Sequence, residues 1–556
     1  MATTRRRFLA ESGLAALGAV TAAGCGPGSS TVTTKSPIGA VTIDTQAPTA
    51  PSSFELDDIA IDLLQQRIQS GQYTARRLTE LYLARIVALD RQGPALRAVL
   101  EANPDALRIA DELDAERRRK GPRGPLHGMP ILVKDNLDTG DRMMTTAGSL
   151  ALEGLTRSRD AHVVARLRAA GAVVLAKTNL SEWANFRSTR SSSGWSARGG
   201  QCRNPYVLDR SPCGSSSGTG AGIAASYAAA GIGTETDGSI VCPASVNALV
   251  GLKPTVGLVS RSGIVPIAQS QDTAGPMTRT VKEAAILLGV IAGVDVADDV
   301  TRASAVNARV DYTQFLDPNG LRGARLGVPR KKFFGYSPDT DRVIASALDD
   351  MRRLGAVIVD LPDLPHADEL DNPELELLLY EFRDGLNRYL AGLPPASAVR
   401  SLKDLIAFND KNRDREMPYF GQELLLMAQE KGPLTDPRYR EIRALTSRLS
   451  RQEGIDAVMT QHTLDALVAP TGNPAWPIDL VNGDHVVGGS STPAAVAGYP
   501  SLTVPAGSVR GLPVGVSFFG RAFAEPTLLK LAYAYEQATR HRRPPTFLRT
   551  ADLTAR

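Results

Sequence analysis

One long segment in the middle of the chain, residues 188–275, is dominated by Gly, Ser, Thr and Ala. Such a composition on its own is typical of a flexible linker. This segment, however, contains apolar stretches as long as a helix or a strand, at 223–230, 240–250 and 264–267. Small residues inside a core allow close backbone approach, which a preorganised site requires. The segment therefore indicates a small-residue core built around a site.

The sequence around this segment alternates between strand-like and helix-like periods. Apolar runs at 130–133 and 172–176 have strand length, and 161–170 between them has the spacing of a helix. This order is typical of crossover units in a buried sheet, so the expected fold class is α/β. Further strands are expected at 324–328, 466–469, 501–504 and 514–518. Helices are expected over 56–68, 78–86, 104–120, 281–293 and 528–540, with a mainly helical region over 339–449.

The amino-acid composition excludes several classes of function. Apolar residues make up 43% and charged residues 22% of the 556 residues, the balance of a soluble globular protein. Lys and Arg number 63 against 59 Asp and Glu, and a net charge of +4 is too small for a nucleic-acid-binding footprint. Neither Cys-x-x-Cys nor His-Glu-x-x-His occurs, so no metal site is expected.

The first 25 residues have the organisation of an export signal. A basic start, Arg5-Arg6-Arg7-Phe8-Leu9, precedes an apolar stretch that ends at Ala22-Ala23-Gly24-Cys25. The basic part resembles a twin-arginine signal, and the end resembles a lipoprotein cleavage box with Cys25 as the lipidated residue. The alternative is an amphipathic helix of a cytoplasmic protein. Residues 26–53 are rich in Ser, Thr, Pro and Gly and predict a flexible spacer.

Three places carry residues suited to catalysis. Lys134 directly follows the apolar run 130–133, where desolvation would lower its pKa and make it a general base. The simpler interpretation is a solvated lysine paired with Asp135. The run 214–220, Gly-Ser-Ser-Ser-Gly-Thr-Gly, contains Gly-x-Ser-x-Gly around Ser216, a pattern of hydrolase nucleophile turns that also arises by chance in such a segment.

The third place is the run 233–240, Gly-Thr-Glu-Thr-Asp-Gly-Ser-Ile. A strand-like run there leads into a turn whose N–H groups could bind an oxyanion, although a plain β-turn is the alternative. A hydroxyl nucleophile needs a base, and none of the six His lies in 188–275. Lys134 is then the natural base, acting through one serine on another. Ser215 and Ser239 suit that relay.

Taken together, these motifs resemble the amidase signature family. The resemblance rests on Gly128–Asn136, Gly214–Gly218, Gly238–Ile240, Gly251–Thr255 and Gln271–Met277. It implies one catalytic domain over 54–556 with a mixed central sheet covered by helices. It also implies a nucleophile at Ser239, a bridging Ser215 that follows a cis peptide bond, and a base at Lys134. Thr236, Asp237 and Gly238, with Ser239, would hold the oxyanion, and Lys253 would be structural.

The resemblance implies an amidase that releases ammonia from carboxamides without metal or organic cofactor. Asp237, where Gly is usual, is expected to tolerate unusual backbone angles. This departure, with Glu235 and Cys213, is similar to the peptide amidase branch and implies C-terminal peptide amides as substrates. Tyr380-Glu381-Phe382, on a helix expected to border the pocket, supports the same branch. A small-molecule or peptide amide is the expected partner, with no nucleic acid and no membrane contact beyond the signal or a lipid on Cys25.

Three alternatives stay open at this point. One is the amidase component of a complex that amidates aminoacyl-tRNA, which the export signal disfavours. Another is a Ser–His–Asp esterase or hydrolase using Ser216, with His127 or His462 as base. The third is an exported binding lipoprotein without turnover. Cys202, Cys213 and Cys242 are either buried small residues or, in an oxidising compartment, include one disulfide whose pairing the sequence does not fix.

Overall fold

The computed structural model describes residues 54–552. The predicted export signal at 1–25, with Cys25, and the predicted spacer at 26–53 lie outside the described residues. Among the helices in 54–552, none is both long and apolar enough to cross a membrane.

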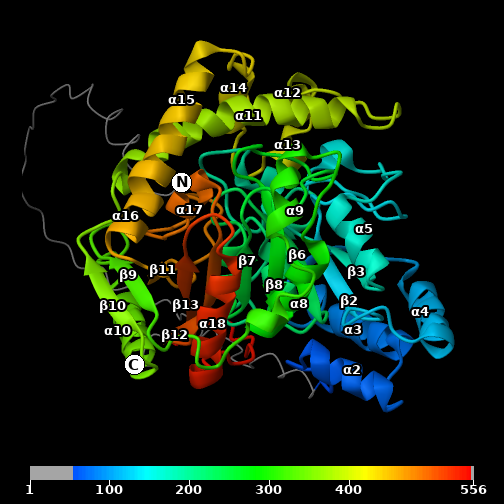
Figure 1. Cartoon of the computed structure of the whole chain (residues 1–556). Helices are drawn as coiled ribbons and strands as arrows, with labels where there is room; N and C mark the ends of the chain where they lie inside the picture. The colour runs from blue at the N-terminus through cyan, green and yellow to red at the C-terminus, as the bar shows by residue number, and fades with distance from the viewer. Residues whose placement is uncertain (1–53, 553–556) are drawn as a thin grey trace, which may run out of the picture.

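A single large sheet runs through the molecule (Figure 1). In the described part of the chain its eleven strands follow the order β1-β3-β2-β6-β8-β7-β12-β13-β11-β9-β10. Strands β3, β2 and β6 are parallel, as are β11, β9 and β10, and the other neighbouring pairs are antiparallel. The expectation of a mixed central sheet is therefore confirmed.

The strands have the following bounds: β1 Val99–Ala102, β2 Pro130–Lys134, β3 Val173–Thr178, β4 Trp195–Ser196, β5 Gly200–Gln201, β6 Ala230–Glu235, β7 Val250–Lys253, β8 Thr273–Thr278, β9 Arg325–Pro329, β10 Val357–Leu361, β11 Ala466–Pro470, β12 Ser501–Val509 and β13 Leu512–Phe519. The two short strands β4 and β5 form a separate ribbon.

The α-helices have these bounds: α2 Ile61–Gln69, α3 Ala75–Asp90, α4 Ala106–Lys120, α5 His162–Ala169, α6 Ser217–Ala224, α7 Val241–Val246, α8 Val281–Ile291, α9 Ser304–Asn307, α10 Pro338–Arg353, α11 Asp371–Ala391, α12 Leu402–Lys411, α13 Arg413–Glu416, α14 Glu423–Gln429, α15 Pro437–Ser447, α16 Asp456–Gln461, α17 Thr492–Ala497 and α18 Glu525–Thr539. Shorter helical segments are η1 Leu150–Leu152, η2 Glu182–Asn185, η3 Asp299–Ala303, η4 Thr313–Phe315, η5 Ala367–Glu369 and η6 Arg448–Ile455.

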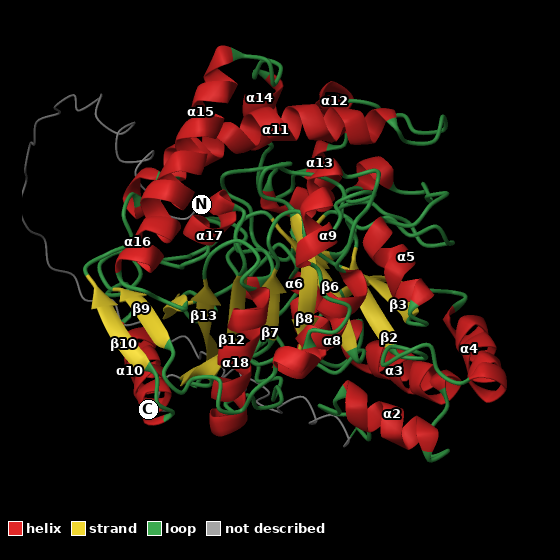
Figure 2. Cartoon of the chain, in the orientation of Figure 1, coloured by secondary structure: helices red, strands yellow, loops and turns green. Residues whose placement is uncertain are grey.

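The helices cover the sheet and one of its ends (Figure 2). Helices α11, α12, α14 and α15 lie together at the top of the view, whereas α2, α3 and α4 lie at the lower right. The largest cluster of buried apolar side chains packs around the sheet, a second one packs against its β10–β11–β13 end, and a third joins α11, α12 and α14 to the body. The upper helices therefore rest on the body through an apolar contact of their own.

The small-residue segment forms the centre of this core. Two of its apolar stretches are each divided between a helix and the following strand, 223–230 between α6 and β6, and 240–250 between α7 and β7. Every residue of α6 is buried, because Gly, Ala, Ser and Thr leave room for neighbouring backbone. A Cβ atom at Gly218 would lie 2.2 Å from the carbonyl oxygen of Ala98, so only Gly fits there. The third stretch, 264–267, forms no helix or strand beyond a single bridge at Ile264.

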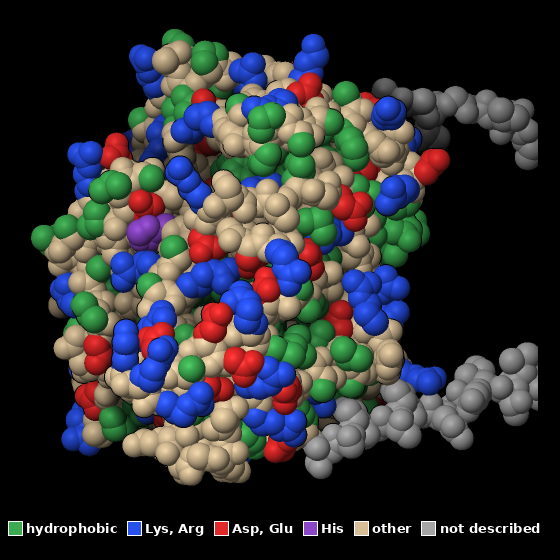
Figure 3. Space-filling view, turned by 90° about the vertical axis from the view of Figure 1, so that its right-hand side faces the viewer, with side chains coloured by type: hydrophobic (Ala, Val, Ile, Leu, Met, Phe, Trp, Pro, Cys, Tyr) green, Lys and Arg blue, Asp and Glu red, His purple; other side chains and the backbone are tan. Residues whose placement is uncertain are grey.

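The strands expected from apolar runs are confirmed in place as β2, β3, β9, β11, β12 and β13. Strand β10 lies inside the region expected to be mainly helical, so that expectation is wrong at 357–361. This strand lies at the edge of the sheet and pairs only with β9, and its short apolar run, Val357–Val359, is flanked in sequence by the long helices α10 and α11. On the face shown in Figure 3, basic and acidic side chains are intermingled rather than gathered into one basic patch.

Candidate active site

Lys134 is the last residue of β2 and is fully buried. Its Nζ lies 2.7 Å from Ser215 Oγ, 2.8 Å from Thr234 Oγ1 and 3.3 Å from the Thr234 carbonyl oxygen. Strand β2 lies beside β6, so the end of one strand presents the amine and the end of the other presents Thr234. The interpretation of Lys134 as a solvated lysine paired with Asp135 is wrong.

Burial sets the protonation of this lysine. It lowers the pKa of Lys134 to about 7, although the carboxylates of Asp272 and Glu235 oppose the shift. Near pH 7, Lys134 is therefore a neutral amine in a large fraction of the molecules. A neutral amine has two N–H groups and one lone pair. With both N–H groups donated to the two Thr234 oxygens, the lone pair faces Ser215 and can accept its hydroxyl proton.

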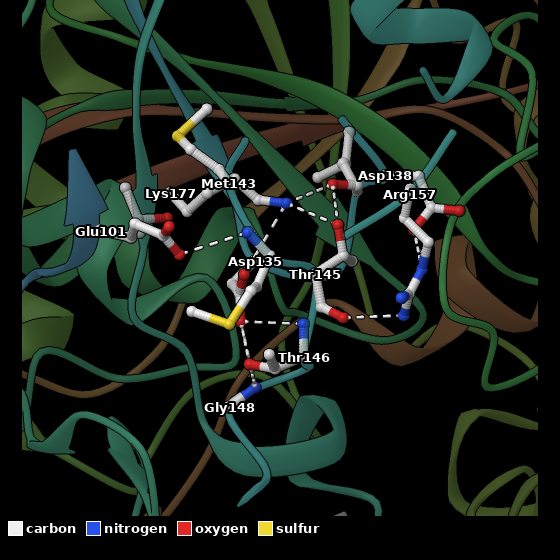
Figure 4. Close-up of polar contacts among 12 residues, drawn as sticks. Glu101, Asp135, Asp138, Met143, Thr145, Thr146, Gly148, Arg157 and Lys177 are labelled. Carbon is white, nitrogen blue, oxygen red and sulfur yellow. Dashed lines mark hydrogen bonds and ion pairs between the residues drawn. The ribbon is translucent and has the colours of Figure 1, made fainter. Parts of the chain in front are cut away.

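Asp135 belongs to a separate buried network (Figure 4). Asp135 follows the last residue of β2, and its carboxylate accepts from the N–H of Thr146, whereas Lys134 contacts Ser215 and Thr234. Its Oδ1 lies 3.7 Å from Lys177 Nζ, which also donates to the Leu137 carbonyl at 2.6 Å and to Thr145 Oγ1 at 2.9 Å. Lys177 ends the apolar run of β3 as Lys134 ends that of β2. The same sequence signal thus marks two lysines, and only one faces the serines.

Ser215 and Ser216 follow one another at the start of α6 but face different partners. The Gly214–Ser215 peptide bond is cis. Ser216 Oγ donates to the Thr234 carbonyl at 3.1 Å and accepts from the Thr234 N–H at 3.2 Å, so its hydroxyl is bound to the backbone of β6. The ring of His127 contacts the Leu113 carbonyl, near α4. The structure does not support a Ser–His–Asp site at Ser216.

Ser239 lies in the turn between β6 and α7, and this turn, Thr236–Ser239, is named here the oxyanion turn. The N–H of Ser216 donates to the carbonyl of Ser239 at 3.2 Å, which places Ser239 beside the Ser215–Ser216 pair. Within 54–552 the N–H groups of Asp237, Gly238 and Ser239 have no acceptor. Gly238 has φ of 79°, the left-handed region that a turn of this shape requires. Such free N–H groups can stabilise an oxyanion.

Two carboxylates, those of Glu235 and Asp237, hold the oxyanion turn in place. The carboxylate of Glu235 accepts from the N–H groups of Ile240 and Val241 at 2.7 and 3.0 Å, at the start of α7. Asp237 accepts from Thr492 Oγ1 at 2.7 Å, at the start of α17. Asp237 is not among the residues with positive φ, so the expectation that it supplies unusual backbone angles is wrong. It anchors the turn through its carboxylate instead.

A disulfide joins the two serine-bearing segments. Cys213 and Cys242 are bonded, with their Cα atoms 6.0 Å apart and 29 residues apart in sequence. Cys213 comes two residues before Ser215, and Cys242 three residues after Ser239. Cys202 is buried and free. The disulfide thus fixes the relative position of the Ser215 and Ser239 backbones.

Lys253, the other lysine of the motifs, is buried behind the oxyanion turn. Its Nζ donates to the Tyr499 carbonyl at 2.7 Å, and burial lowers its pKa to about 8, although Glu235 opposes this. Its bonds are to backbone oxygen atoms, as expected of a structural residue. Among residues 54–552, no group of three or more His, Cys, Asp or Glu side chains is placed to hold a metal ion.

Comparison with known proteins decides the family. The family model described as "Amidase" matches residues 77–529. The chain belongs to the amidase signature family. A probable amidase of Arabidopsis thaliana is 42% identical over 506 residues, covering 89% of this chain and 93% of that protein.

Solved structures of the family extend the likeness to the fold. The native peptide amidase of Stenotrophomonas maltophilia is 54% identical, with a TM-score of 0.85, and covers 89% of this chain and 100% of that one. A peptide amidase in complex with the competitive inhibitor chymostatin is 55% identical, with a TM-score of 0.86, and covers 88% and 100%. A glutamyl-tRNA(Gln) amidotransferase component of a Roseiflexus strain is 35% identical and covers 87% and 97%. The chain is therefore a hydrolase of amide C–N bonds, close to peptide amidase.

Proposed function

We propose that this amidase releases ammonia from the C-terminal amides of peptides by acyl transfer to Ser239. The observation that carries the proposal is the 2.7 Å contact between the buried amine of Lys134 and Ser215 Oγ. In this contact Lys134 is a base of suitable pKa, and Ser215 is a hydroxyl that can relay a proton. Both lie beside a turn with free N–H groups.

The proposed reaction begins with proton transfer along the relay. Neutral Lys134 accepts the proton of Ser215, which accepts that of Ser239 as Ser239 Oγ attacks the amide carbonyl. Negative charge develops on the carbonyl oxygen, and the N–H groups of the oxyanion turn stabilise it by about 3 kcal/mol for each well-placed donor. The proton returns through Ser215 to the leaving nitrogen, the C–N bond breaks, and ammonia departs. Water then attacks the acyl-enzyme by the same relay and releases the acid.

The substrate class rests on the likeness to peptide amidases, at 54–55% identity. We expect N-acetyl-leucinamide and glycyl-leucinamide to release ammonia with kcat/KM at least about 100-fold above that of acetamide, because binding energy from the peptide part is used at the reacting carbonyl. An enzyme-coupled ammonia assay, with mass spectrometry of the acid product, measures this. Equal rates for acetamide would refute the substrate class, and binding without product would favour a binding protein.

We also propose that the protein is exported, with residues 1–25 as a twin-arginine signal and Cys25 as a candidate lipid attachment site. Disulfides persist in oxidising compartments, and the Cys213–Cys242 bond agrees with such a location. Closure of its loop, which spans 29 residues, constrains the unfolded chain and corresponds to about 3–4 kcal/mol of stability.

An export experiment follows from the signal and the disulfide. We expect the full-length protein to be recovered from the bacterial envelope with Cys213 and Cys242 oxidised. The double variant Arg5→Lys, Arg6→Lys should stay in the cytoplasm with the thiols of Cys213 and Cys242 free. Its free energy of unfolding should be about 3–4 kcal/mol lower than that of the exported protein. Fractionation, thiol titration and denaturant unfolding measure these effects. Envelope recovery of the double variant would contradict the signal, and membrane attachment that survives Cys25→Ser would contradict the lipid.

A further inference from the structure

We infer from the structure that Gln271 is a positioning residue, which aims the N–H group of Asp237 by holding the carbonyl group of Thr236. The inference rests on the proposed function, because it concerns the turn that receives the oxyanion. Gln271 and its neighbours Ser270 and Asp272 precede β8 and are named here the clamp segment.

The geometry of one peptide unit carries the argument. The side chain of Gln271 is fully buried, and its Nε2 donates to the Thr236 carbonyl oxygen at 3.3 Å. That carbonyl and the N–H of Asp237 belong to the same peptide unit. A trans peptide is planar, and its C=O and N–H bonds point in opposite directions. Any tilt of the carbonyl therefore tilts the N–H of Asp237 by the same angle.

Helix α11 holds the clamp segment from behind. Gln271 Nε2 also donates to Glu374 Oε1 at 2.8 Å. Seven residues further along α11, Glu381 Oε2 accepts from the N–H of Ser270 at 2.9 Å. Glu381 Oε1 in turn accepts from Tyr439 on α15 at 2.9 Å. The amide of Gln271 is thus fixed by a long helix and cannot drift with the turn that it holds.

Asp272 holds the same residue of the turn through its side chain. Thr236 Oγ1 donates to Asp272 Oδ1 at 2.6 Å, and Asp272 Oδ2 accepts from the N–H groups of Ile267 and Ala268 at 2.8 and 2.9 Å. Thr236 is therefore bound at its carbonyl by Gln271 and at its hydroxyl by Asp272. With both contacts made, the peptide plane between Thr236 and Asp237 has little freedom to rotate before the oxyanion forms.

A positioning role and a purely structural role of Gln271 predict different kinetics. Misaimed oxyanion donors weaken binding of the transition state while leaving ground-state binding nearly unchanged. A peptide aldehyde whose hemiacetal with Ser239 mimics the tetrahedral state reports the same loss as an inhibition constant. A structural role would instead lower thermal stability or raise KM, without a matched effect on the aldehyde.

The decisive variant is Gln271→Met, which keeps the size of the side chain and removes its amide. We expect kcat for N-acetyl-leucinamide to fall about 10- to 100-fold, with KM within about threefold and the inhibition constant of a leucinal-ended peptide aldehyde raised by the same factor as kcat falls. The control is Gln66→Met, which alters an exposed glutamine on α2, away from the oxyanion turn, and should leave all three values unchanged.

Thermal unfolding and circular dichroism establish that the variants are folded. If Gln271→Met does not fold, Thr236→Val removes the other contact of the clamp segment, the hydrogen bond from Thr236 Oγ1 to Asp272. This variant should lower kcat and the affinity for the aldehyde together. A folded Gln271→Met enzyme with kcat within twofold of wild type overturns the inference, as does a loss of kcat without a matched loss of aldehyde affinity. Either result leaves the proposed function standing, because that function is tested separately by product formation from peptide amides and by turnover in Ser239→Ala.

Discussion

Replacement of Ser239 by Ala is expected to lower kcat for peptide amides by about 10⁴- to 10⁶-fold, because removal of a nucleophile abolishes the acyl-enzyme route. Ser239 is 8% exposed, and its carbonyl oxygen accepts from the N–H of Ser216, an interaction that does not involve the side-chain hydroxyl. Loss of the hydroxyl should therefore change the free energy of unfolding by less than about 1 kcal/mol. Ammonia release under single-turnover conditions measures the first effect, and denaturant unfolding measures the second.

The matched control is Ser216→Ala, which removes a neighbouring hydroxyl of the same kind. Ser216 Oγ bridges the N–H and carbonyl of Thr234, so its removal should affect stability by about 1 kcal/mol and kcat by less than tenfold. Ser215→Ala should behave like the Ser239 variant, because the relay to Lys134 is then broken. If Ser216→Ala were inactive and Ser239→Ala active, the assignment of the nucleophile would be reversed.

The sequence predicts the elements of this fold where an apolar run or period is unbroken. Strands β2, β3 and β11 are buried along their whole length, and the apolar residues that bury them also identify them. Strand β10 escapes prediction although Val357–Val359 is an apolar β-branched run, because the run is short and lies between the long helical patterns of α10 and α11. The division of 223–230 between α6 and β6 escapes prediction because Ala and Gly carry little preference for either period.

Sequence motifs identify residues of the candidate site, but they do not predict which side chains contact one another. The run 128–136 identifies Lys134 as a residue of interest, yet Lys177 follows a buried strand in the same way and faces Asp135 instead. Gln271 lies inside the family motif Gln271–Met277, but its role depends on Thr236, 35 residues away, and on Glu374, 103 residues away. The sequence holds no local sign of such long-range bonds, because they are made only when β6, β8 and α11 meet.

Lys134→Met is expected to lower kcat by about 10²- to 10⁴-fold, since the relay loses its base but the nucleophile and the oxyanion turn remain. In the wild type only the neutral amine accepts a proton, so kcat/KM should fall tenfold per pH unit below the Lys134 pKa of about 7 and level off above it. The residual activity of the variant should lack this acid limb. A pH–rate profile from pH 5 to 9 with N-acetyl-leucinamide measures both.

The same lysine links stability to pH with a defined sign. The folded-state pKa of Lys134 is about 7, below its ordinary value, so between these two values the unfolded chain binds more protons than the folded one. The wild type should therefore gain stability from this residue as pH rises through that window, and carry the full penalty of a buried ammonium below pH 7. Lys134→Met removes the penalty, so its stability relative to the wild type should be greatest at pH 6 and decrease toward pH 10. A variant that lost activity but showed no such pH-dependent difference would place Lys134 in the charged state throughout, and a charged ammonium cannot accept the proton of Ser215.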